Sequence, residues 1–202
     1  TTTLVDKLAR GDEPTKTEKA RYRHPDIKEA LVIETRGKCA YCESKLQHIH
    51  HGDVEHIYPK SLDPARTFEW ANLTLACEIC NQNKSNKDPL VVNILDPYTA
   101  DPAAHLIFMG ALVFDRGTPL GIGSKEILDL NRAELAEVRK SQLEKIMNIF
   151  TTLQRTDLSV VQKKAIFQNL VANEGGVSAP YTAMAAAAIE TIKTNLPTEV
   201  TT

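Results

Sequence analysis

The chain has 202 residues, which is enough for one or two modest domains with a real hydrophobic core. Apolar residues make up 42% of the sequence, but no run approaches the ~20 consecutive apolar residues of a membrane span, so we expect no membrane partner. The formal net charge of −2 argues against a long, non-specific surface for wrapping DNA.

The N-terminal segment, residues 1–35, is predicted to be a polar arm followed by a helix. Its first residues lack the basic and apolar parts of a signal peptide, so we expect a cytoplasmic protein. An apolar pattern runs over residues 18–34, and Pro25 limits the helix to the second half of that pattern.

The next segment, residues 36–90, is dense in cysteine, histidine and asparagine. Residues 54–57 predict a short strand that Pro59 stops, and residues 73–76 form a second apolar piece. Residues 78–87 are expected to form a short helix, because Asp88-Pro89 disfavours its continuation.

The remaining chain divides into a connecting segment, residues 91–123, and a helical region, residues 124–202. The connecting segment holds two β-like runs, at residues 91–94 and 107–114, separated by turn signals. Helices are expected at residues 124–150 with a break near Asn131, then at residues 158–172 and 180–195. Ser124 is a weak candidate for the first N-cap.

All four cysteines lie in two pairs of identical spacing, Cys39-x-x-Cys42 and Cys77-x-x-Cys80. In a cytosolic chain, two such pairs indicate a metal site before they indicate disulfides. Four thiolates are the usual tetrahedral ligand set of a closed structural zinc site. The alternatives are reduced cysteines that bind nothing and a redox Cys-x-x-Cys, which normally occurs once. The spacing favours Zn²⁺.

Between the two cysteine pairs lie Glu55-His56-Ile57, Pro59-Lys60 and Asn72-Leu73, and Asn81 follows the last cysteine. Hydrolysis of a phosphodiester requires a nucleophile, charge stabilisation at the phosphoryl oxygens and help for the leaving oxygen. A neutral histidine can take a proton from water near pH 7. A divalent cation held by a carboxylate and an amide oxygen can act on the phosphate and on the leaving oxygen.

This order of motifs resembles the HNH (ββα-metal) endonuclease family over about residues 36–88. The resemblance implies an α+β fold, in which a ββα-metal core sits on a four-cysteine zinc knuckle and a helical C-terminal region follows. It also implies a role for each motif residue: His56 as general base, Glu55 and Asn81 as ligands of a catalytic Mg²⁺ or Mn²⁺, Asn72 as the brace of the turn that orients His56, and Lys84 as a phosphate contact.

The sequence departs from the commonest family form, which has Asp before the histidine. Glu55 is one methylene longer, so Asp53 is an alternative ligand. Adjacent strand residues point to opposite faces, so Glu55 and His56 share a site only if the strand ends or twists there. Trp70 is expected to pack against the knuckle. Three histidines in the polar turn before Gly52 are expected to be solvated, with a metal or substrate contact as the alternative: His48, His50 and His51.

Other segments are similar to one subgroup of the family, which includes retron-associated HNH proteins and the PtuB nucleases of Septu anti-phage systems. They are Lys38-Cys-Ala-Tyr-Cys-Glu43, Glu69-Trp-Ala-Asn-Leu73 and Ile127-Leu-Asp-Leu-Asn-Arg132, with Leu135 and Arg139 following. The resemblance implies an effector nuclease of anti-phage defence that acts on nucleic acid, DNA rather than RNA, beside an ATPase partner. Residues 124–195 would dock that partner or, alternatively, form a plain helical cap.

Two other functions stay open at this point. One is a non-catalytic zinc-knuckle module that binds nucleic acid or protein without turnover, which the acidic balance and Glu55 favour. The other is a nuclease that is silent until its partner is added.

Overall fold

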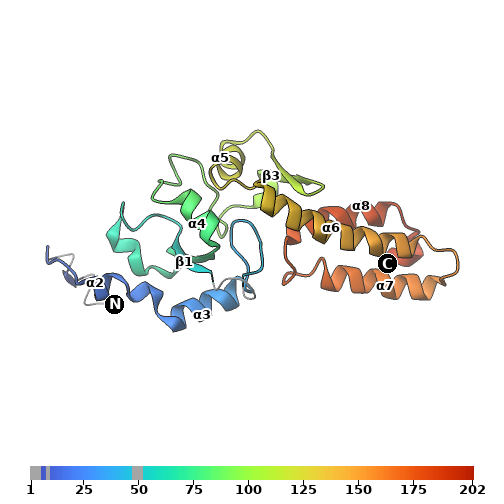
Figure 1. Ribbon diagram of the computed structural model, residues 1–202, viewed down its shortest axis with the longest axis horizontal. Helices are drawn as coiled ribbons and strands as arrows, with labels where there is room; N and C mark the ends of the chain where they lie inside the picture. Colours follow the sequence, from blue (N-terminus) through green and yellow to red (C-terminus); the bar gives the residue numbers. More distant parts are fainter. Residues whose placement is uncertain (1–5, 8–9, 47–51) are drawn as a thin grey trace.

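The computed structural model describes residues 6–7, 10–46 and 52–202, so His48, His50 and His51 lie outside the described residues. Figure 1 shows an elongated molecule, with the sheet β1–β2 and its helices at one end and a group of long helices at the other. Among the described residues, no helix combines the length and the apolar composition that a membrane span requires.

The N-terminal helices lead into the sheet. Helix α2 (Lys16–Lys19) begins with a capping box between Thr15 and Glu18, and a 3₁₀ turn over Arg21–Arg23 follows. Helix α3 (Pro25–Glu34) begins at Pro25, as predicted, because the fixed φ of proline suits the first helical position. Leu31 on α3 is fully buried in the core that α3 shares with the sheet.

The ββα unit consists of β1 (Asp53–His56), β2 (Leu73–Ala76) and α4 (Glu78–Lys84). The two strands pair antiparallel, with Asp53 opposite Ala76 and His56 opposite Leu73. Gly52 precedes β1 with φ +67°, and a Cβ there would lie 2.8 Å from the Cδ1 of Leu46. The structure therefore confirms the predicted α+β core and its three elements.

The connecting segment differs from the prediction at residues 91–94, which form a turn and not a strand. Asn93 adopts a left-handed φ of 58°, and Gly123 packs so closely that a Cβ would lie 2.4 Å from the Asn93 carbonyl oxygen. The run at 107–114 is a hairpin of β3 (Leu106–Met109) and β4 (Leu112–Asp115), which turns at Gly110 with φ +61°.

The helical region begins earlier than predicted. Helix α5 (Pro119–Ile127) has Thr118 as its N-cap, and Pro119 occupies the first turn. The expectation that Ser124 caps this helix is wrong: Ser124 is buried inside α5, and its Oγ accepts from the backbone N–H of Leu95 at 2.8 Å. The predicted break near Asn131 is confirmed, because α6 (Ala133–Leu153) starts after it.

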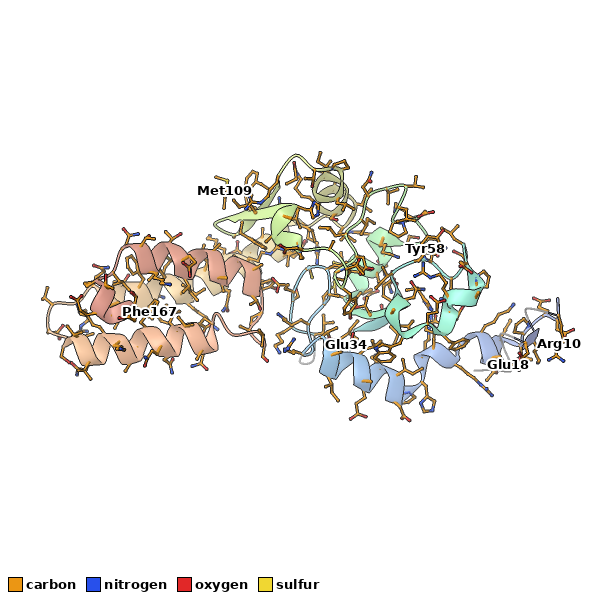
Figure 2. The ribbon with its side chains drawn as sticks, turned by 180° about the vertical axis from the view of Figure 1, so that it is seen from behind. Arg10, Glu18, Glu34, Tyr58, Met109 and Phe167 are labelled. Carbon is orange, nitrogen blue, oxygen red and sulfur yellow. The ribbon has the colours of Figure 1, made fainter. Side chains whose placement is uncertain are left out.

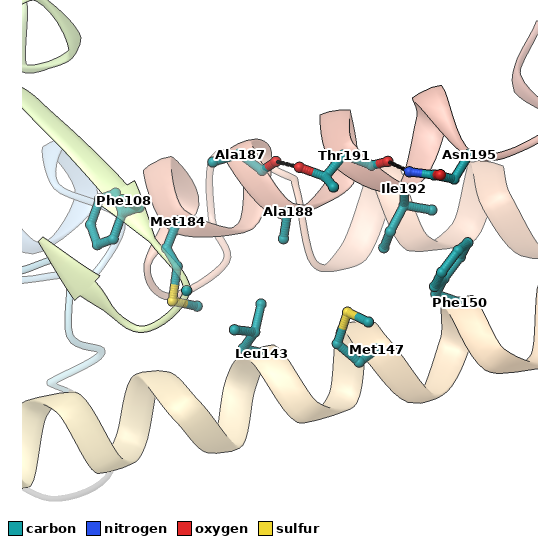
Figure 3. Close-up of a pocket in the computed structure, with 11 residues that line it drawn as sticks. Phe108, Leu143, Met147, Phe150, Met184, Ala187, Ala188, Thr191, Ile192 and Asn195 are labelled. Carbon is teal, nitrogen blue, oxygen red and sulfur yellow. Dashed lines mark hydrogen bonds between the residues drawn. The ribbon is translucent and has the colours of Figure 1, made fainter.

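Helices α7 (Val160–Asn173), α8 (Thr182–Thr194) and α9 (Thr198–Thr201) complete the chain. They enclose a second core with α6 around Ile146 and Leu170. Helices α6 and α8 and the hairpin also border an apolar cavity of about 280 Å³, shown in Figure 3. Its lining holds no ionisable side chain, so it is unsuited to hydrolytic chemistry.

Candidate functional site

The four cysteine sulfurs come together at the base of the ββα unit. The Sγ atoms of Cys39, Cys42, Cys77 and Cys80 all lie within 4.8 Å of one another, and the pair Cys42–Cys77 is 3.9 Å apart. A tetrahedral zinc ion with Zn–S bonds of ~2.3 Å places its sulfurs ~3.8 Å apart. The cluster therefore fits one metal ion.

Local backbone contacts hold both cysteine pairs in place. The N–H of Cys39 donates to the Ser44 carbonyl at 2.9 Å, which closes the first turn. The Sγ of Cys77 accepts from the N–H of Cys80 at 3.3 Å and so caps α4. The N–H of Ala40 donates to the Leu75 carbonyl at 2.9 Å, which ties the first turn to β2.

His56 ends β1 and is only 5% exposed. Its Nε2 lies 3.1 Å from the backbone carbonyl of Thr67, which can only accept, so in the neutral ring Nε2 carries the proton and Nδ1 keeps a lone pair. The Tyr22 ring lies edge-on to the imidazole at a centroid distance of 4.6 Å. Burial lowers the pKa of His56 to about 4, so the side chain is neutral at pH 7.

Asn72 is fully buried under the loop that follows His56. Its Oδ1 accepts from the Tyr58 N–H at 2.7 Å, and its Nδ2 donates to the carbonyls of Tyr58 at 3.0 Å and Arg66 at 3.1 Å. The backbone carbonyl of Asn72 accepts from Ile57 at 3.0 Å. These bonds fix both the loop after β1 and the 3₁₀ turn (Pro64–Phe68) that contains Thr67.

Lys84, for which the resemblance implied a phosphate contact, lies at the end of α4 beside β1. It is 1% exposed, and its Nζ donates to Glu55 Oε1 and to the His56 carbonyl, both at 2.8 Å. Burial raises the pKa of Glu55, and the Lys84 ammonium opposes that rise. Because the Lys84 ammonium is buried and already donates to two acceptors, it is suited to positioning Glu55 and the end of β1.

Asn81 on α4 faces Asp53 on β1. The Nδ2 of Asn81 donates to Asp53 Oδ2 at 3.1 Å, which leaves the amide Oδ1 as the atom that Asn81 can offer to a cation. Asp53 lies on the same strand face as Glu55, since successive strand residues alternate.

His56, Glu55 and Asn81 line one cavity of about 270 Å³. Three consecutive residues at the end of β1 contribute to its lining: Val54, Glu55 and His56. Figure 2 shows the molecule from behind, with Tyr58 at the end that carries this cavity and Phe167 among the helices at the other end.

The cavity also has a basic and aromatic wall that the sequence analysis missed. It is formed by Tyr22, Arg23 and Lys60. The Nζ of Lys60 donates to the Tyr22 hydroxyl at 2.9 Å, and the Arg23 guanidinium lies 5.3 Å from the Tyr22 ring centroid. The run Arg21-Tyr22-Arg23 was the available signal, because clustered arginines around an aromatic residue are typical of nucleic-acid contacts.

Trp70 does not behave as predicted. It is 45% exposed, and its Nε1 donates to Glu34 Oε2 on α3 at 2.9 Å. The indole therefore ties the loop before β2 to α3 and does not pack into the knuckle.

A catalytic divalent cation fits the cavity in donor chemistry. The carboxylate of Glu55 and the amide oxygen of Asn81 are hard oxygen donors, as Mg²⁺ prefers. Within residues 6–7, 10–46 and 52–202, no group of three His, Cys, Asp or Glu side chains other than the cysteines brings its ligand atoms together. Water and substrate would complete the coordination, which is usual for Mg²⁺.

Comparison with known proteins agrees with this geometry. Residues 39–87 match the family model described as HNH endonuclease. The chain is 35% identical over 83 residues to a Septu protein PtuB of Bacillus thuringiensis, covering 41% of this chain and 32% of that protein. It is 28% identical over 150 residues to a Septu protein PtuB of Bacillus mycoides (strain KBAB4), covering 58% of this chain and 51% of that protein. The chain thus spans about a third to a half of these relatives.

Proposed function

Because residues 39–87 form an HNH endonuclease domain, we propose that the protein is a metal-dependent endonuclease that cuts DNA during anti-phage defence. The observation that carries the proposal is the single cavity that His56, Glu55 and Asn81 line together with Arg23 and Lys60. The likeness to two Septu proteins supports the defence role.

His56 is the general base of the proposed reaction. The Thr67 carbonyl holds the Nε2–H, so Nδ1 takes the proton from the attacking water. A phosphate anion in the cavity stabilises the imidazolium that forms, which offsets the low pKa that His56 has in the protein without substrate. Asn72 positions this base through the loop and the turn that carry its partners.

Glu55 and Asn81 would hold the catalytic Mg²⁺ or Mn²⁺, and that ion would supply charge stabilisation for the reacting phosphate. Lys60 and Arg23 on the cavity wall attract the phosphate backbone and neutralise part of its charge. Lys84 opposes the rise in the pKa of Glu55 that burial causes, and its ammonium orients that carboxylate. A Zn²⁺ ion on the four cysteines stabilises the fold of the domain.

The decisive experiment is cleavage of plasmid DNA and of matched DNA and RNA oligonucleotides with Mg²⁺ or Mn²⁺. Loss of a general base typically costs 10²–10⁴-fold in rate, so His56→Ala should lose cleavage by that factor. His105→Ala is the matched control, because His105 hydrogen-bonds to Thr118 and does not line the cavity that holds His56. Equal cleavage by wild type and His56→Ala would reject the assignment, and preferred cleavage of RNA would reject DNA as the substrate.

A second candidate is a module that binds nucleic acid without turnover. The ion pair between Glu55 and Lys84 favours it, since an ammonium at 2.8 Å competes with a cation for the carboxylate. This candidate predicts binding without cleavage under every metal condition, and unchanged binding after His56→Ala. A nuclease that needs its partner would begin to cleave once the partner is added.

The proposed partner is an ATPase that docks on the helical region. Supporting this location, the apolar cavity between α6 and α8 opens beside Met147, which is 45% exposed (Figure 3). Met147→Glu should abolish co-purification with the ATPase partner that we propose. Val161→Glu, on the exposed face of α7, is the control and should not. Equal co-purification of both variants would place the partner elsewhere.

A further inference from the structure

The segment Ile127–Arg132 links α5 to α6, and the nuclease chemistry above does not use it. Leu128 and Leu130 are buried in the core shared with the knuckle. Asn131 bonds both backbone groups of Val113, accepting from its N–H at 2.9 Å and donating to its carbonyl at 2.8 Å. The segment is therefore clamped between the hairpin and the knuckle, and its last residue is held in a defined place.

Arg132, at the end of this segment, points its guanidinium at the cysteine cluster. Its Nη2 lies 3.7 Å from Cys42 Sγ and 3.8 Å from Cys77 Sγ, and its Nη1 lies 3.9 Å from Cys80 Sγ. These are N–H···S hydrogen-bond distances to three of the four sulfurs. Two backbone carbonyls of the same segment, Leu128 and Asp129, accept from Nη1 and fix the fork in this orientation.

The charge of the cluster explains why a guanidinium belongs there. Four thiolates around one divalent cation carry a net charge of −2, and three of the cysteines are buried. A buried, uncompensated charge is costly, and a planar guanidinium can meet several acceptors at once while it offsets that charge. Groups that bond to metal ligands in this way raise metal retention, and their loss typically costs 10–100-fold in metal affinity.

We propose that Arg132 positions the zinc-binding thiolates, offsets their negative charge and so makes metal retention depend on the junction with the helical region. This inference rests on the proposed zinc site. In this arrangement the segment Ile127–Arg132 couples the two parts of the molecule: displacement of α6 would withdraw the guanidinium and loosen the metal.

The test measures zinc content and then the rate at which a chromogenic chelator extracts zinc from the full chain. Arg132→Gln should release zinc 10–100-fold faster than wild type. Arg155→Gln is the matched control, because Arg155 is exposed and pairs with Asp157 away from the sulfurs, and it should match wild type. With Co²⁺ in place of zinc, the thiolate-to-metal charge-transfer band should shift in Arg132→Gln, which a purely structural role would not cause.

Asn131→Ala separates metal retention from general loosening of the junction, since it removes the clamp on Val113 and keeps the guanidinium. The inference is overturned if Arg132→Gln releases zinc at the same rate as Arg155→Gln. It is also overturned if Arg132→Gln releases zinc at the same rate as Asn131→Ala and its cobalt band is unshifted. If Arg132→Gln fails to fold, Arg132→Lys against Arg155→Lys replaces it: faster release from Arg132→Lys supports the inference and equal release rejects it. Wild-type protein without zinc would instead refute the proposed zinc site itself.

Discussion

Replacing the buried Asn72 amide with a carboxylate tests whether Asn72 braces the site. Asn72→Asp keeps the shape and the bond from the Tyr58 N–H, but it places an oxygen against the carbonyls of Tyr58 and Arg66. Two donated bonds are lost and two partly buried acceptors lose their partner, at about 1–3 kcal/mol each. We therefore predict a loss of about 2–6 kcal/mol in the free energy of unfolding at pH 8, a large share of a typical 5–15 kcal/mol.

The stability deficit of Asn72→Asp should also depend on pH. Burial beside two carbonyls raises the folded-state pKa of the introduced carboxyl above its unfolded value. The folded state then binds the extra proton more readily, so the deficit relative to wild type is full at high pH and shrinks as pH falls. Urea unfolding at pH 8 and pH 6, followed by the fluorescence of the single tryptophan, Trp70, measures both effects. Asn148→Asp, on the exposed face of α6, is the control. A variant as stable as wild type, or a deficit that grows at lower pH, would refute the reasoning.

Further substitutions address the ion pair, the knuckle and the basic wall. Lys84→Met should destabilise the protein by about 3–5 kcal/mol in urea unfolding, because it leaves Glu55 buried without a partner. Adding Glu55→Gln should recover part of the lost stability. No recovery would mean that the cost is not electrostatic. Cys80→Ser, or removal of zinc by a strong chelator, should abolish the cooperative unfolding transition of the ββα unit, and a retained transition would show that the fold does not need the metal. Lys60→Gln should weaken DNA binding and reduce its salt dependence by about one counterion, whereas Lys145→Gln on α6 should change neither.

The parts of the site that the sequence predicted are those set by short-range patterns. Cys-x-x-Cys spacing fixes two sulfurs within one turn, so the thiolate cluster follows from the sequence. Pro25 likewise acts over a few residues, and α3 begins there as predicted. Helix α4 begins at Glu78 as predicted but ends at Lys84, three residues before the predicted end at residue 87, because Ser85 adopts a positive φ of 52°.

The parts that the sequence did not predict depend on contacts between distant segments. Tyr22 and Arg23 reach the cavity because α3 packs on the sheet, and nothing in residues 1–35 reveals that packing. The burial of Lys84 was not predicted, because its partner Glu55 lies on a different element, β1. Val91, Val92 and Ile94 predicted a strand, yet a left-handed Asn93 and the close approach of Gly123 select a turn.

A double-mutant cycle, measured as the rate of DNA cleavage, tests most directly whether His56 and the catalytic cation act on the same phosphate in one cavity. His56→Ala, Asn81→Ala and the double variant are compared with wild type at saturating Mg²⁺. Groups that act on the same reacting phosphate are strongly non-additive, so the double variant should be no slower than the slower single variant. Rate losses that multiply, or full cleavage by either single variant, would contradict a shared site.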